Sequence, residues 1–266
     1  MVRVRREYVE GKYGQIHLWV AGEETPGVLP LYCAHQSPKH GGEFSNFMAA
    51  AGEHRLVVAP DYPGYGMSDT PPNESDVTID FYAESLWSVA DQLGHYKVDL
   101  FGNHTGSKVI SAMTMAQPER VGSLVMISAT ILTPDEHKMF NDYFQPVPLD
   151  DAGTRFSTMW ERIVERRGPG ATMEMMARSF AMNLMGGEAY EWGHHAAFAW
   201  WKEEEHALQT LPHRITILNP NDDLTECTRR AAPMLRNGKI IELPEWGYNF
   251  MDVWPEESAQ LVLSNL

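Results

Sequence analysis

Strand-like apolar runs alternate with segments of helical periodicity along most of this chain, and no other feature restricts its fold as strongly. Residues 6–24 alternate around a glycine-containing turn and predict a hairpin. Further runs lie at 55–60 (RLVVAP), 96–102 (YKVDLFG) and 121–129 (VGSLVMISA), with helical patterns at 77–95 and 105–120 between them. A strand that is buried on both faces of a sheet is apolar throughout. The alternation therefore predicts an α/β fold, a mostly parallel sheet with helices on both faces.

One long stretch departs from this alternation. Residues 134–196 contain Met-rich helical patterns and no strand, whereas a strand pattern returns at 214–222 (RITILNPND). We therefore expect a core made of residues 1–133 and 197–266, with residues 134–196 inserted as a helical cap or lid. Such an insertion would lie over the carboxyl ends of the strands, where open α/β sheets place their ligands.

Composition and charge exclude several classes of protein. The chain has 266 residues and a net charge of −15, so it lacks the basic excess of a nucleic-acid-binding protein. No segment of about 18 uncharged apolar residues suggests a membrane span, and the first residues do not resemble a signal peptide. Two cysteines, Cys33 and Cys227, fit a reduced compartment better than a disulfide scaffold. We expect a cytoplasmic protein that binds a small molecule. The sequence leaves open whether the chain forms a homodimer.

A strand-to-helix junction at residues 102–106 (GNHTG) carries the strongest functional signal. The pattern G-x-S-x-G in this context marks a sharp turn that exposes a catalytic serine, and here the central residue is His104. The chain resembles the α/β-hydrolase fold superfamily over nearly its whole length, and within it a subgroup with histidine at this turn. Four further stretches carry the resemblance: CAHQSP (33–38), RLVVAPDYPGYGMSD (55–69), ILNPNDD (217–223) and PEWGYNFMDVWPEE (244–257).

His104 stands where the superfamily has its nucleophile. Gly102 and Gly106 provide the small neighbours that a tight turn needs. The side chain would lie at a helix N-terminus, where the helix dipole disfavours an imidazolium, so we expect a neutral imidazole at pH 7. Such a group could attack an acyl carbon or accept a proton. The alternative is a packing histidine on a turn that has lost its activity.

The resemblance also implies partners for His104. Tyr248 falls where the superfamily has its general base, and a phenol is a poor base at pH 7 but can donate a proton. Asp223 matches the acid of the catalytic triad best, with its neighbour Asp222 as the second candidate. Asp223 would contact His104 directly or through water. Tyr248 could instead simply fill space, and Asp223 could be a solvated loop residue.

Two backbone N–H groups would complete the site. The resemblance implies that an oxyanion hole is formed by the N–H groups of Gln36 and Thr105, since a backbone donor survives any change of side chain. The Met-rich insertion predicts a partly apolar substrate pocket. The residues that we expect to line this pocket are His35, Trp192, His195 and Trp246.

We expect no cofactor and no metal. Neither His35 with His40 nor the pair His194-His195 has metal-ligand spacing with a third ligand nearby, and the chain has no glycine-rich phosphate-binding loop. Three functions compete. The first is hydrolysis of an ester, thioester or related acyl bond by His104. The second is a lyase, isomerase or carbon–carbon cleavage reaction with His104 as base and Tyr248 as acid. The third is binding of a small molecule without catalysis.

Overall fold

The computed structural model describes residues 1–266 and has one eight-stranded sheet at its centre, in the order β1-β2-β4-β3-β5-β6-β7-β8. Neighbouring strands from β4 to β8 pair in parallel, whereas β1, β2 and β4 pair antiparallel. The predicted hairpin and the predicted mostly parallel sheet are therefore confirmed. The strands are β1 (Arg5–Gly11), β2 (Gly14–Ala21), β3 (Leu31–Ala34), β4 (Val57–Pro60), β5 (Val98–Asn103), β6 (Val121–Ile127), β7 (Ile215–Pro220) and β8 (Gly238–Leu243).

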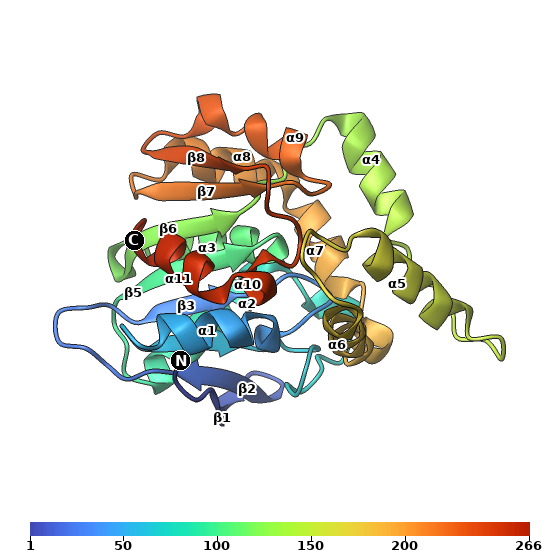
Figure 1. Ribbon diagram of the computed structural model, residues 1–266, viewed down its shortest axis with the longest axis horizontal. Coiled ribbons are helices and arrows are strands. Elements are labelled where there is room, and N and C mark those ends of the chain that lie inside the picture. The colour runs from blue at the N-terminus through green and yellow to red at the C-terminus, as the bar shows by residue number, and fades with distance from the viewer.

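Helices cover both faces of this sheet because successive strand residues face opposite sides. Leu100 of β5 belongs to the larger core cluster, with side chains of α2 and α3, whereas Phe101 packs in the second cluster with α1 and α11. Figure 1 shows α1, α10 and α11 in front of the sheet. The helices that flank the sheet are α1 (Ser45–Ala51), α2 (Ile79–Gln92), α3 (Thr105–Ala116), α8 (Trp201–Thr210), α9 (Thr225–Arg229), α10 (Phe250–Val253) and α11 (Pro255–Leu263).

The helical segment between β6 and β7 contributes side chains to the candidate site described below. It contains α4 (Pro134–Tyr143), α5 (Thr154–Glu165), α6 (Met173–Leu184) and α7 (Trp192–Ala199), followed by α8, and no strand. Figure 1 shows α4, α5 and α6 beyond one end of the sheet. Since α7 continues to Ala199, it crosses the boundary that the sequence places at residue 196. These helices follow local signals, such as the Thr133 side chain that caps α4 in a capping box with Glu136.

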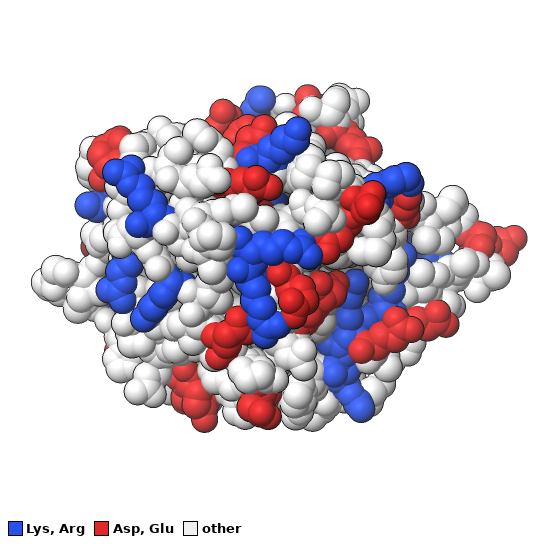
Figure 2. Space-filling model, turned by 90° about the horizontal axis from the view of Figure 1, so that it is seen from above, with Lys and Arg blue, Asp and Glu red and all other residues white.

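The helix lengths, the surface and the cysteines add three observations. None of the helices is both long enough and apolar enough to cross a membrane. Seen from above, acidic and basic side chains are intermixed over the face that Figure 2 shows, so this face has no continuous surface of one sign. Cys33 and Cys227 are both unpaired and buried.

Candidate active site

The turn between β5 and α3 presents His104 in a strained backbone conformation. His104 has φ 50° and ψ −107°, a region that residues other than glycine rarely occupy, and its N–H donates to the carbonyl of Ile127 at 3.0 Å. A Cβ on Gly106 would lie 1.8 Å from the carbonyl oxygen of Ala34, and one on Gly102 would lie 2.5 Å from the carbonyl oxygen of Gly106. Both glycines are therefore required by close backbone contacts.

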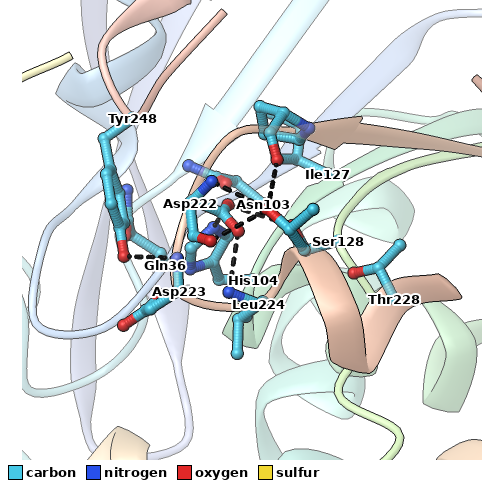
Figure 3. A network of polar contacts seen from close by, with 12 residues as sticks. Gln36, Asn103, His104, Ile127, Ser128, Asp222, Asp223, Leu224, Thr228 and Tyr248 are labelled. Atoms are coloured by element: carbon cyan, nitrogen blue, oxygen red, sulfur yellow. Dashed lines mark hydrogen bonds and ion pairs between the residues drawn. The ribbon is translucent and has the colours of Figure 1, made fainter. Parts of the chain in front are cut away.

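His104 contacts Asp222, and not Asp223. His104 Nε2 lies 3.0 Å from Asp222 Oδ2, and the Asp222 side chain is fully buried (Figure 3). Ser128 Oγ donates to the same carboxylate oxygen at 3.1 Å, and the Leu224 N–H donates to Oδ1 at 2.8 Å. The expectation of a direct contact from Asp223 is wrong, and Asp222, the second candidate, makes that contact. The loop after β7 turns so that Asp222 faces the sheet, while the Asp223 carboxylate pairs with Arg166 at 3.1 Å.

The ionisation of His104 also differs from the sequence-based expectation. Burial favours the neutral imidazole, but the hydrogen bond and charge of Asp222, with the charges of Asp223 and Glu43, raise the pKa of His104 above its ordinary value. The helix dipole alone does not decide its charge. Because Asp222 only accepts, Nε2 carries a proton, and the neutral ring has its lone pair on Nδ1. No protein group is bonded to Nδ1, so this nitrogen is free to act as a base.

Tyr248 lies beside His104, as the sequence suggests. The two ring centroids are 5.9 Å apart, and the Tyr248 hydroxyl oxygen accepts the Asp223 N–H at 3.0 Å (Figure 3). Burial and the charge of Asp223 raise the pKa of the phenol. The hydroxyl therefore stays protonated at neutral pH and can donate, but it cannot act as a base. Its catalytic role stays a prediction.

The two expected oxyanion donors differ in whether another group already accepts their hydrogen bond. The Thr105 N–H is the first of α3 and has no acceptor within the helix. The Gln36 N–H, by contrast, donates to Glu43 Oε1 at 2.9 Å, and Gln36 Nε2 donates to Glu43 Oε2 at 2.8 Å. The expectation that Gln36 offers a free N–H is therefore wrong. Sequence reasoning missed Glu43 because no motif or spacing marks a single acidic residue seven positions after Gln36.

His104 opens onto a cavity of about 140 Å³ between the sheet and the segment 134–200. Gln36, Thr105, Asp223 and Tyr248 line it from the side of the sheet. The segment between β6 and β7 contributes aromatic, methionine and charged side chains, which are Phe140, Phe144, Met159, Arg162, Arg166, Met176, Tyr190, Glu191, His194 and Phe198.

None of the four predicted pocket residues lines this cavity. His35 is fully buried, donates from Nδ1 to the Gln36 carbonyl and accepts the Tyr62 N–H at Nε2, and burial lowers its pKa to about 3. Trp192 packs against the larger core cluster. Trp246 instead packs against other aromatic rings, stacked with Trp254 and tilted against Phe250.

His195, the fourth predicted pocket residue, is bonded elsewhere. Its Nδ1 lies 2.5 Å from Glu74, and its Nε2 lies 3.1 Å from the carbonyl oxygen of Phe144. The preceding residue, His194, lines the cavity instead. Adjacent residues of a helix point in directions about 100° apart, which sequence alone did not resolve.

A buried ion pair forms part of the same wall, and the sequence did not signal it. Lys108, one turn into α3, pairs with Glu204 of α8. Thr130 also donates to Glu204, from Oγ1 at 2.6 Å. Lys108 and Thr130 both line the cavity. No group of three or more His, Cys, Asp or Glu side chains is arranged to hold a metal ion.

Comparison with known proteins identifies the family. The profile of the alpha/beta hydrolase fold matches residues 30–183, more than half of the chain. This chain belongs to the alpha/beta hydrolase fold family. A solved structure, that of a thermophilic esterase from Thermogutta terrifontis, superposes with a TM-score of 0.75 at 19% identity, over 98% of this chain and 97% of the esterase. Epoxide hydrolase A from Mycobacterium thermoresistibile gives a TM-score of 0.79 at 20% identity, over 99% and 98%.

Curated relatives match over a shorter stretch. The 2-hydroxy-6-oxononadienedioate/2-hydroxy-6-oxononatrienedioate hydrolase of Escherichia coli K12 is 42% identical over 118 residues. That stretch is 44% of this chain and 41% of the relative. The chain thus aligns with less than half the length of this relative.

Proposed function

We propose that this chain is a hydrolase that acts on a small, partly apolar molecule, with His104 as general base and an ester, thioester or related acyl bond as the first class to test. The hydrogen bond between His104 and buried Asp222 carries the proposal. It joins a base and its orienting acid at the wall of a cavity, and His104 Nδ1 is free toward a ligand. The hydrolases among its relatives support the same reaction class.

Each residue of the site has a distinct role in the proposed reaction. His104 Nδ1 takes a proton from a water molecule as the water oxygen forms a bond to the acyl carbon. The resulting imidazolium carries its second proton on Nε2, where the Asp222 carboxylate stabilises it. The bond from the acyl carbon to the leaving oxygen or sulfur then breaks, and the leaving group takes up the proton from Nδ1, which returns His104 to its neutral form. The Tyr248 hydroxyl, held protonated by its raised pKa, donates to the oxygen or leaving group that gains charge. Residues 134–196 act as the lid that limits the access of bulk water.

His104 could instead attack the substrate itself and form an acyl-imidazole that water then hydrolyses. Base and nucleophile differ in one observable, since only the nucleophile forms a covalent adduct of the enzyme. The orientation by Asp222 serves both roles.

A second function, non-hydrolytic catalysis with His104 as base and Tyr248 as acid, has its own supporting observation. The Gln36 N–H is bonded to Glu43, so the arrangement for stabilising an acyl oxyanion is incomplete. A lyase, isomerase or carbon–carbon cleavage reaction does not require that donor.

The test is turnover of a panel that contains nitrophenyl esters, an acyl thioester, an aryl epoxide and a 2-hydroxy-6-oxodienoate. Wild type is compared with His104→Ala and with His206→Ala, which removes an exposed histidine of α8. We expect turnover by wild type and by His206→Ala, and its loss in His104→Ala. Intact mass during turnover separates the two roles, because a nucleophile gives a transient acyl mass on His104. No activity on the panel, or equal activity of the His104 variant, would reject the proposal.

A further inference from the structure

Glu43 is a buried carboxylate next to the turn that carries His104. It is 7% exposed and lies in the short helical turn Gly41–Phe44 that precedes α1. Three hydrogen bonds reach it, all from amide groups: the Gln36 N–H at 2.9 Å, Gln36 Nε2 at 2.8 Å and Asn103 Nδ2 at 3.3 Å. Asn103 is the residue directly before His104. Glu43 is therefore held between the loop after β3 and the turn after β5.

Burial of the Glu43 carboxylate costs free energy unless amide donors replace the hydrogen bonds that it made with water. Burying a carboxylate requires that its oxygens be hydrogen-bonded, and here three amide donors from two residues fulfil that need. Burial still raises the pKa of Glu43 above its ordinary value. The mechanism proposed above makes no use of this group, although its charge is one of those that raise the pKa of His104.

The donor that Glu43 occupies belongs to the wall of the substrate cavity. Gln36, His104 and Thr105 line this cavity together. Glu43 itself faces a side cavity of about 10 Å³, room for about one water molecule. Lys39 and Tyr248 line both cavities. The carboxylate thus lies just behind the position where a ligand oxygen would meet the Gln36 N–H.

We propose that Glu43 excludes anions from the position beside His104, so that the ligand group bound there is uncharged. The inference rests on the proposed function, in which His104 is the reacting centre. A carboxylate or oxyanion at this position would compete with Glu43 for the Gln36 N–H and would meet a charge of the same sign. Two consequences follow for acyl hydrolysis. Charge that develops on the substrate oxygen is stabilised from the side of Thr105 and Tyr248, and the carboxylate product is repelled from the site.

The test measures the binding of phenylacetate, a carboxylate whose ring suits the phenylalanines of the cavity wall. Glu43→Gln removes the charge at nearly constant volume, and Glu43→Ala also frees the Gln36 N–H. We expect both variants to bind phenylacetate at least about tenfold more tightly than wild type at pH 7 by calorimetry. Phenylacetamide, the neutral amide of the same shape, should show a much smaller difference between wild type and the variants.

A matched variant separates a local effect from the general field. Glu191→Gln removes another buried carboxylate of the cavity wall, one that pairs with His194 and Arg162 and has no hydrogen bond with Gln36. It should strengthen phenylacetate binding less than Glu43→Gln does. Equal binding by wild type and Glu43→Gln, an equal effect of Glu191→Gln, or no phenylacetate binding by any variant would overturn the inference.

Two features keep the result of this test independent of misfolding and of the proposed hydrolysis. Thermal unfolding monitors the fold, and Glu43→Gln alone decides the outcome if Glu43→Ala does not fold. Binding does not require turnover. A tighter complex of Glu43→Gln together with an inactive wild type would therefore reject the proposed hydrolysis while supporting anion exclusion by Glu43.

Discussion

Replacing Asp222 by asparagine tests the central contact of the site. The Asp222 carboxylate accepts from His104 Nε2 at 3.0 Å and from Ser128 Oγ at 3.1 Å, and it is fully buried. An asparagine has the same shape, but one of its two positions becomes an amide donor. If that donor faces His104, the imidazole must place its proton on Nδ1, and the lone pair that accepts a proton from water is lost.

The expected loss of kcat/KM in Asp222→Asn follows from the proposed role of His104 as general base. General-base catalysis contributes about 10² to 10⁴ in rate, so we expect Asp222→Asn to lower kcat/KM by about this factor. Asp223→Asn is the matched control, since its side chain is 34% exposed and its contact is an ion pair with Arg166 at 3.1 Å. Such pairs contribute about 0–1 kcal/mol, so Asp223→Asn should change kcat/KM by no more than about fivefold.

The pH dependence gives a second measurement of the same contact. Burial lowers the pKa of His104, and Asp222 more than compensates and raises it. Loss of the Asp222 charge therefore lowers this pKa, and the acid limb of the activity profile moves to lower pH. Titration of the His104 ring by NMR measures the same shift without a substrate.

The assay is kcat/KM between pH 5 and 9 for wild type and both asparagine variants, with thermal unfolding as the control for folding. The reasoning would be refuted if Asp223→Asn lost as much activity as Asp222→Asn. A His104 pKa that did not fall in Asp222→Asn would refute it as well.

Two further predictions concern stability. Gly106→Ala should lower the free energy of unfolding in urea by more than about 3 kcal/mol, because its Cβ would overlap the Ala34 carbonyl oxygen. Gly27→Ala has nothing within 4 Å of its Cβ and should cost only about 1–2 kcal/mol for its positive φ. Similar losses in the two variants would contradict the steric argument. The pKa of His35 is about 3 in the folded state and about 6.5 when unfolded, so the unfolded state binds an extra proton below pH 6.5, and stability falls as the pH drops toward 3. This contribution amounts to about 2 kcal/mol between pH 6.5 and 5, and His35→Gln should remove that part of the pH slope; an unchanged slope would show that His35 titrates normally.

Local sequence signals predicted most of the core. The strand between residues 121 and 129 and the helix that begins at Thr105 both form where apolar runs and periodicity place them. After β7, by contrast, α9 ends at Arg229 and a 3₁₀ turn follows at Ala232–Met234, where Pro233 removes a backbone donor.

The site was predicted only in part. His104 and Tyr248 lie together as the motifs indicated, because both follow strands whose carboxyl ends meet at one edge of the sheet. The choice between Asp222 and Asp223 depends on how one loop turns, and neighbouring residues in such a loop look equivalent in the sequence. The prediction that His195 lines the pocket failed for a similar reason, since the rotation of α7 places His194 rather than His195 in the cavity wall.

What the sequence determined by itself is therefore the set of elements and the sharp turn at His104, since hydrophobic periodicity and the strand–turn–helix motif act over a few neighbouring residues. Only the tertiary structure decided which groups surround that histidine. Asp222, Glu43 and the Lys108–Glu204 pair come from segments far apart in the chain. Their charges and hydrogen bonds act through space, and a linear pattern contains no record of those distances.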